Sequence, residues 1–259
     1  MSATDTDRRA ELRAAWTEVH GPPNAAAEQL LEQSPSYFAR VLDFTAHAWR
    51  RGPLPPKVKA LILLAVDSAA SHRNGPGAAD DVRRALALGA TPAEVLEVLE
   101  LTSTMGIHAA NTGVPILLEE LAKAGRPVDL DAPLTPRQEE IKAEFTRKRG
   151  YWNDFWDGFL RLDAEFFAAY TAMSAHPWEH GPLEPKVKEL VYCAFDASAT
   201  HMFAPGLRQH VANALRYGAT AEEIMEVFEL ASGIGVGSFA LALPALREAV
   251  AEAAGEERG

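Results

Sequence analysis

The sequence contains very little cysteine and no long apolar run. Cys193 is the only cysteine among 259 residues, so an internal disulfide and a dithiol mechanism within one chain are both excluded. No uninterrupted apolar run reaches the roughly 18 residues that a membrane-spanning helix needs. The N-terminal stretch MSATDTDRRAELRAAW lacks the apolar core of a secretory signal. We therefore expect a cytoplasmic protein that does not enter a membrane.

Basic residues are also scarce relative to acidic ones. The chain has 25 Lys and Arg against 36 Asp and Glu, for a net charge of -11. Binding to nucleic acid depends on Lys and Arg that neutralise phosphates, so this balance argues against a nucleic acid or an anionic membrane surface as partner. A small-molecule substrate remains the expected partner.

Strand patterns are missing as well. Apolar residues recur at helical spacing, and no stretch alternates as a half-buried strand does. Thr91 with Glu94, and Thr220 with Glu223, have the spacing of a capping box. We predict an all-α fold with Glu97 exposed, and helices in the first half at about residues 11–19, 36–49, 57–72, 78–88, 91–104 and 109–124.

A repeat with an offset of 129 residues organises the chain. Residues 52–101 and 181–230 agree at 25 of 50 positions without a gap, where chance would give roughly a tenth or less. We interpret this as a tandem duplication, with a first unit at residues 1–130 and a second unit at 131–259. The proline-rich, polar connector RPVDLDAPLTPRQEE is typical of an exposed crossing between units.

The segment PKVKEL from Pro185, followed by HVANALRYGATAEEIMEVFEL from His210, resembles the carboxymuconolactone decarboxylase family, which includes the alkylhydroperoxidase-D-like proteins. The resemblance covers about 60 residues of each unit. It implies an all-α fold that forms homotrimers or hexamers, so a trimer of this two-unit chain would be a pseudo-hexamer.

The resemblance also assigns residues. The peroxidase branch has Cys-x-x-Cys-x-x-x-His, but Phe203 and Gly206 stand where its cysteines would be, which excludes dithiol peroxidase chemistry. The decarboxylase branch implies acid–base chemistry by His210, with Glu189 as the family's glutamate. The first unit has Ala60 and Asp81 at these two places, so we expect one working site per chain.

Other candidates come from the repeat. His72 and His201 are repeated histidines beside a Pro-Gly turn, and histidine titrates near neutral pH; each is either an assisting catalytic group or a structural histidine. Asp67 and Asp196 precede them by five residues, about 140° around a helix, so we expect no direct Asp–His pair within a unit.

Residues that break the repeat suggest an asymmetric pocket. His108 has no repeated counterpart and could face His201 across a pseudo-twofold axis. Around the Pro-Gly turn, Phe203 replaces Asn74, while Arg73 could hold a substrate carboxylate. We therefore treat His108, Phe203 and Arg73 as candidate substrate-binding residues.

No ligand-binding pattern for a metal or nucleotide is evident. His176 and His180 have the four-residue spacing of helix ligands, but Pro177 between them favours a loop. We predict no metal and no cofactor.

Two functions remain. The first is a cofactor-free lyase of the decarboxylase type acting on a small cyclic acid or lactone, with His210 as the main proton-transfer residue, His201 and His72 assisting and Glu189 orienting. The alternative is a ligand-binding or scaffold relative without redox chemistry, or with changed chemistry.

Overall fold

A computed structural model describes residues 3–256, and these contain helices but no strand. The all-α prediction is confirmed. The first unit consists of α1 (Ala3–His20), α2 (Ala25–Gln33), α3 (Pro35–Arg51), α4 (Pro56–Ser68), α5 (Gly75–Ala87), α6 (Pro92–Ser103), the 3-10 turn η1 (Thr104–Ile107) and α7 (His108–Lys123).

The second unit has the same order of helices. They are α8 (Pro136–Arg149), α9 (Phe155–Leu162), α10 (Ala164–His180), α11 (Pro185–Ala197), α12 (Ala204–Arg216), α13 (Ala221–Ser232), η2 (Gly233–Val236) and α14 (Gly237–Glu256). From α3 to η1, every boundary recurs 129 residues later in the segment from α10 to η2. Both predicted capping boxes are present, at the starts of α6 and α13.

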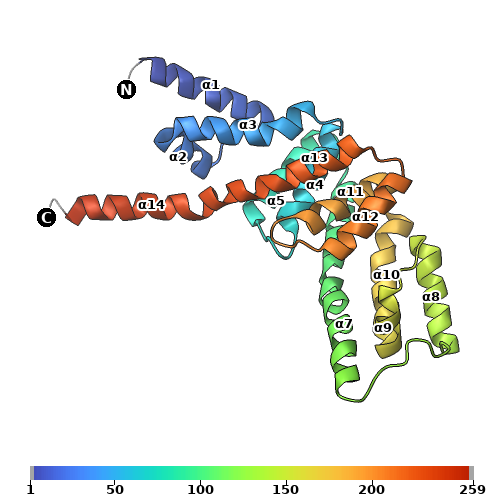
Figure 1. Ribbon diagram of the computed structural model, residues 1–259. Helices are drawn as coiled ribbons and strands as arrows, with labels where there is room; N and C mark the ends of the chain where they lie inside the picture. The colour runs from blue at the N-terminus through green and yellow to red at the C-terminus, as the bar shows by residue number, and fades with distance from the viewer. Residues whose placement is uncertain (1–2, 257–259) are drawn as a thin grey trace.

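The two units exchange their last helices. Figure 1 shows α4, α5, α11, α12 and α13 at the centre, with α7 extending in one direction and α14 in another. The α7 helix of the first unit packs against α9 of the second, and α14 of the second packs against α2 of the first. Each unit therefore closes part of the other, and a site beneath α7 contains residues from both.

The shared core forms around α4 and α11, whose Leu61 and Leu190 are fully buried. Two buried ion pairs join the units. Lys188 Nζ lies 2.8 Å from Glu97 Oε1, and the equivalent Lys59 and Glu226 pair lies at 2.6 Å. The prediction that Glu97 is exposed was wrong, because its side chain is 1% exposed.

Glu97 also accepts a hydrogen bond from the backbone N–H of Leu183 in the other unit, at 2.7 Å. Helical periodicity places Glu97 on the same side as Glu94, toward solvent. That reasoning covers one helix only, so it could not see the second unit pack over this face and bury the charge.

Several local predictions need correction. The helix expected to reach His72 ends at Ser68, and the chain then turns. Helical angles therefore do not apply to His72, whose Nε2 lies 3.4 Å from Asp67 Oδ1. The expectation of no direct Asp–His pair within a unit was wrong for this reason. Two short helices, α2 and α9, were not predicted.

The segment around Pro177 is helical rather than a loop. Pro177 lies inside α10, which continues to His180. The rings of His176 and His180 are consequently neighbours on one helix, with centroids 4.7 Å apart. Proline has no N–H, so one backbone hydrogen bond of this helix is missing at Pro177, and the helix nevertheless continues.

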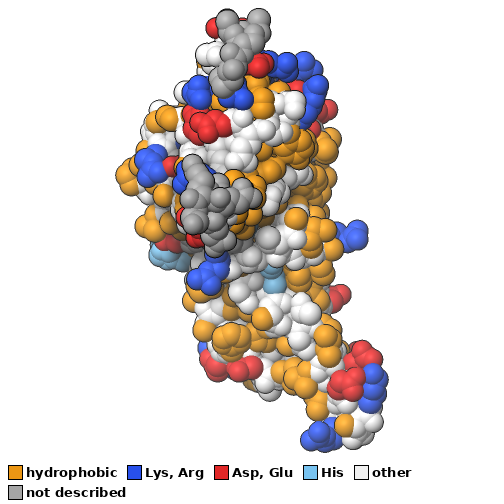
Figure 2. All heavy atoms as spheres, turned by 90° about the vertical axis from the view of Figure 1, so that its left-hand side faces the viewer, with side chains coloured by type: hydrophobic (Ala, Val, Ile, Leu, Met, Phe, Trp, Pro, Cys, Tyr) orange, Lys and Arg blue, Asp and Glu red, His pale blue; other side chains and the backbone are white. Residues whose placement is uncertain are grey.

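Part of the surface is apolar. Leu241, Leu246 and Val250 of α14 are 85%, 50% and 60% exposed, and Figure 2 shows many apolar side chains on the face from which α14 projects. By length and composition alone, the stretch Ala221–Ala253 could cross a membrane, but its α13 portion belongs to the shared core. Exposed apolar helix faces are common at protein–protein contacts, and the homotrimer stays a prediction.

Candidate functional site

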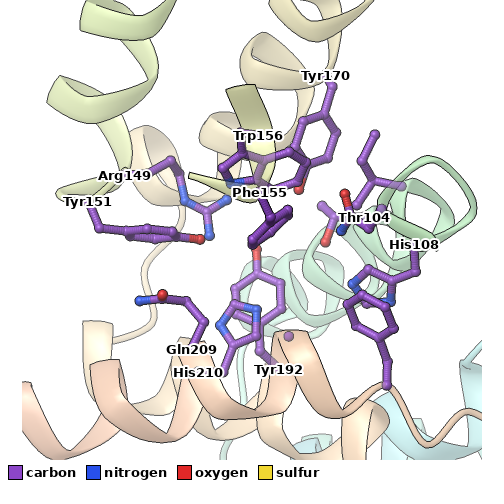
Figure 3. Close-up of a pocket in the computed structure, with 14 residues that line it drawn as sticks. Thr104, His108, Arg149, Tyr151, Phe155, Trp156, Tyr170, Tyr192, Gln209 and His210 are labelled. Carbon is purple, nitrogen blue, oxygen red and sulfur yellow. The ribbon is translucent and has the colours of Figure 1, made fainter. Parts of the chain in front are cut away.

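A small cavity of about 30 Å³ lies where α7 covers the second unit. Such a volume holds about two water molecules. Figure 3 shows Phe155 pointing into its middle, with Arg149 and Tyr151 on one side and His108 on the other. The lining residues are Thr104, Ile107, His108, Asn111, Arg149, Tyr151, Phe155, Trp156, Tyr170, Tyr192, Phe203, Gly206, Gln209 and His210.

A buried histidine–glutamate pair forms one wall. His210, on α12, is 8% exposed and Glu189, on α11, is 1% exposed. His210 Nδ1 lies 2.6 Å from Glu189 Oε2, and Tyr192 stacks on the imidazole with ring centroids 4.2 Å apart. Because Glu189 occupies Nδ1, the other ring nitrogen, Nε2, is left to act on a bound molecule.

Amide side chains hold this pair in place. Asn213 Nδ2 donates to Glu189 Oε1 at 3.1 Å, and Gln209 Nε2 donates to Asn213 Oδ1 at 3.1 Å. Asn153 then donates to Gln209 at 3.3 Å. Since both oxygens of Glu189 are bonded, its carboxylate and the His210 ring have a fixed orientation.

A buried arginine faces the cavity, and none of the described residues forms a salt bridge with it. Arg149, the last residue of α8, is 4% exposed. Its Nη1 donates to the backbone oxygen of Ser174 at 3.1 Å, and its guanidinium lies 5.0 Å from the ring of Trp178. No hydrogen bond is made by Nε, which is also buried. Buried charges are normally paired, so this guanidinium is suited to bind an anionic group.

Phenolic side chains surround the guanidinium. Burial opposes the charge of Arg149, but the oxygens of Tyr192, Tyr151 and Tyr170 and the carboxylate of Glu189 raise its pKa. Burial raises the pKa of Tyr151 to about 12, so this hydroxyl is a hydrogen-bond donor at neutral pH. The cavity therefore offers one cation and neutral donors to an anion.

A second cluster adjoins the cavity. His108 Nδ1 lies 2.6 Å from His201 Nε2. Asp196 Oδ1 lies 3.7 Å from the former nitrogen and 3.8 Å from the latter. The ring of His108 also stacks on Phe203 with centroids 3.8 Å apart. Asp196 lies close against α12, where Gly206 leaves room because an added Cβ would be 2.4 Å from Asp196 Oδ2.

Burial sets the protonation of this cluster. Burial and the negative charge of Glu189 raise the pKa of Asp196 to about 8. Burial, together with His201 and His210, lowers the pKa of His108 to about 3, and burial lowers the pKa of His201. Both imidazoles are neutral at pH 7.

The sole cysteine is outside this chemistry. Cys193 is fully buried in the core, and burial raises the pKa of its thiol. Redox attack requires the thiolate, which this environment disfavours.

The corresponding region of the first unit has different residues. His20, Pro22, Val41 and Leu63 stand where the second unit has Arg149, Tyr151, Tyr170 and Tyr192. Asp81 replaces His210, and burial, with the charge of Asp67, raises its pKa to about 8. His72 lies beside Asp67 in the first unit and does not line the cavity.

The candidate residues thus separate into three groups. His210, His108 and Phe203 line the cavity, Glu189 bonds to His210, and His201 contacts His108. His72 is in the other unit. Arg73 is exposed with a φ of 55° and lies outside the lining, so its assignment to this pocket was wrong; the turn directs it to solvent.

The arginine of the cavity, Arg149, was missed by the sequence analysis. A basic residue in the last turn of a helix normally has a solvated, dipole-stabilising role, so the position attracts no notice. The available signal was the broken repeat, since the arginine and three tyrosines have no counterparts in the first unit.

Comparisons with known proteins place the chain in a family. Residues 164–254 match the carboxymuconolactone decarboxylase family. The chain is 44% identical to a candidate gamma-carboxymuconolactone decarboxylase subunit from Burkholderia xenovorans LB400, whose 1.70 Å crystal structure it matches with a TM-score of 0.92. That match covers 95% of this chain and 98% of the other. A search of curated proteins finds no match.

Proposed function

The chain belongs to the carboxymuconolactone decarboxylase family, and from this premise we propose that it removes carbon dioxide from a small cyclic carboxylic acid or lactone. His210 supplies the proton, and the reaction uses no cofactor. The observation that carries the proposal is the buried His210–Glu189 pair, 2.6 Å apart, in the wall of a cavity that the buried side chain of Arg149 also lines.

The proposed decarboxylation needs only the substrate, His210 and solvent. The bond between the ring carbon and the carboxylate carbon breaks, and carbon dioxide leaves. The electron pair moves into the substrate's own conjugated carbonyl, which is why no cofactor is needed. The resulting enolate takes up a proton on carbon from Nε2 of the His210 imidazolium. Solvent then reprotonates the neutral imidazole that remains. Positioned proton transfer of this kind contributes typically 10²–10⁴-fold in rate.

Charge placement supports the same assignment. Glu189 beside Nδ1 stabilises the imidazolium that must donate. Arg149, with Tyr151 as a neutral donor, stabilises the oxyanion that develops on the substrate carbonyl. Fixed donors in a buried site act strongly on developing charge, and the phenol of Tyr151, with a pKa of about 12, remains a donor throughout.

Substrate entry requires the lining to move. The cavity of about 30 Å³ is smaller than a cyclic acid, and ligand pockets usually reach about 300 Å³ or more. Phe155 occupies the middle of the space (Figure 3) and comes from α9, the helix under α7. Rotation of this side chain is the smallest change that admits a ring.

Carbon dioxide release from gamma-carboxymuconolactone tests the proposal. We expect turnover by the unaltered protein, and a loss of at least about 100-fold in kcat/KM for His210→Asn. His176→Asn, an exposed change on α10, is the matched control and keeps full activity. Wild-type turnover by a folded His210→Asn variant would remove the assigned role.

The alternative, a ligand-binding relative without catalysis, rested on the changes at Ala60 and Asp81. These changes lie in the first unit, whereas the second unit retains both Glu189 and His210 in contact. Saturable binding of the lactone acid with no carbon dioxide release would favour the alternative.

A further inference from the structure

The seam between the units contains a cluster that the proposed proton transfer does not use. His108, the first residue of α7, comes from the first unit, while Asp196 and His201 come from the end of α11 and the turn after it. One ligand atom from each of the three residues lies within 4.8 Å of the others. The two histidines are 93 residues apart in sequence, so only the folded chain brings them together.

The Asp196 side chain of this cluster accepts no hydrogen bond from the part of the chain that the structure describes. Asp196 is 0% exposed, and both of its carboxyl oxygens lack such a bond. Buried polar atoms are nearly always bonded, and an unpaired buried carboxylate is costly. A cation held between Asp196 and the two ring nitrogens would remove that cost.

We propose that His108 Nδ1, His201 Nε2 and Asp196 Oδ1 bind a divalent transition-metal ion, one per chain, that joins the two units. This site is separate from the His210–Glu189 pair, and it extends beyond the proposed function.

The spacing of the three atoms suits such an ion. Ligand atoms about 2.0–2.1 Å from a tetrahedral zinc ion lie about 3.3 Å from one another. The observed separations of 2.6, 3.7 and 3.8 Å fall on both sides of that value, so shifts below 1 Å suffice. Stacking on Phe203 supports the ring of His108 and limits its movement.

The ligand types favour particular metals. Two imidazole nitrogens and one carboxylate oxygen suit zinc, cobalt or ferrous iron, whereas calcium and magnesium prefer all-oxygen sites. Three protein ligands leave a coordination position for water or a bound molecule, unlike a closed structural site with four.

The first unit provides an internal comparison. Its counterparts of Asp196 and His201 are Asp67 and His72, but Gly237 stands where the third ligand would be. Asp67 Oδ2 accepts a hydrogen bond from Asn74 at 3.0 Å. Asn74 is the first unit's counterpart of Phe203. The carboxylate there is satisfied, which is why we expect one ion and not two.

Metal binding to the full chain, after removal of bound metal with a chelator, tests the site. Zinc titrated calorimetrically should bind one ion per chain at the cluster, and cobalt should give visible absorption bands. His108→Ala and His201→Asn should each weaken binding at least about tenfold, the loss that removal even of an outer-shell partner causes. Asp196→Asn should do the same, with circular dichroism to verify that each variant is folded.

The competing site is the exposed His176–His180 pair on α10. The double variant H176A/H180A should keep the cluster's ion. If the ion is lost in this variant, or if folded His108→Ala binds zinc as tightly as the unaltered chain, the proposal is wrong. Because the readout is metal binding and not turnover, its failure is distinguishable from a failure of the decarboxylase assignment.

Discussion

His210 Nδ1 and Glu189 Oε2 are 2.6 Å apart, although the two residues lie on different helices, α12 and α11. The carboxylate is fixed by Asn213 and the ring by stacking on Tyr192. This arrangement orients Nε2 toward the cavity and fixes a carboxyl group beside Nδ1. The contribution of the His210–Glu189 contact to activity can be measured separately from the contribution of Arg149.

Replacement of Glu189 by Gln should affect turnover more than binding. The amide keeps the shape and a hydrogen-bonding group but removes the charge that stabilises the His210 imidazolium. We expect kcat to fall by about 10–100-fold, a loss of about 1.4–2.7 kcal/mol, with KM within about twofold. Steady-state kinetics on the lactone acid measure this split, and Glu184→Gln, exposed at the start of α11, is the control. A change confined to KM would contradict the positioning role.

Replacement of Arg149 by Met should lower both stability and activity. The phenolic oxygens and the Glu189 carboxylate stabilise the buried guanidinium and raise its pKa, and Met also removes the hydrogen bond to Ser174, so the variant should be less stable than the parent by about 1–3 kcal/mol. Loss of a charged hydrogen bond to the substrate, about 1.5–3 kcal/mol, should lower kcat/KM by about 10–150-fold. Urea unfolding and kinetics test both effects, with exposed Arg147→Met as control. A folded variant with full activity would refute the anion-binding role.

The buried Lys188–Glu97 pair should contribute strongly to the stability of the seam. Glu97→Leu leaves Lys188 charged and 3% exposed, and removing one partner of a buried pair costs about 3–5 kcal/mol. The double variant E97L/K188M should recover most of the loss, because no charge remains unpaired. Chemical unfolding provides the free energies.

The exposed Lys123–Glu119 pair serves as a reference for the seam. Its side chains are 59% and 64% exposed, so solvent screens the two charges, and breaking this pair should cost far less than breaking the buried one. Similar small losses for Glu97→Leu would show that the buried pair adds little.

Asp81→Asn should alter the pH dependence of stability. Burial, with Asp67, raises the pKa of Asp81 from 3.8 to about 8. The stability linked to the protonated carboxyl is fully present below pH 3.8, decreases as pH rises, and is lost above pH 8. The variant cannot ionise, so its advantage over the parent should grow from pH 5 to pH 8 and then level off, reaching up to a few kcal/mol.

Thermal unfolding at several pH values checks the Asp81 prediction. Asp80→Asn is the matched control, since its side chain is 60% exposed on the same helix. If the stability difference between the Asp81→Asn variant and the parent is the same at pH 5 and at pH 8, the raised pKa of Asp81 is contradicted.

Much of the fold could be predicted from the sequence. The capping boxes that begin at Thr91 and Thr220 are local signals, and so is the helical spacing of the apolar residues that follow each of them. Tertiary packing does not alter such signals. Where the sequence analysis failed, the cause was tertiary. Glu97 is buried by the other unit, and His72 lies beyond the true end of α4.

The site divides in the same way. His210 and Glu189 could be identified from a motif, because their positions on neighbouring helices follow from the family pattern. Arg149 has no local signal; its significance comes from burial under α7 and from tyrosines contributed by three other segments. Only packing removes its solvent and leaves its charge available.

The sequence by itself determined the helical content, the duplicated order of helices and the loss of His210 and Glu189 equivalents in the first unit, since these follow from spacing and identity within each copy. The tertiary structure decided which residues meet. Exchange of α7 and α14 between the units places His108 beside His201 and Asp196, and it closes the cavity over Arg149. Such contacts depend on how two helical faces pack, and no periodicity within one segment encodes them.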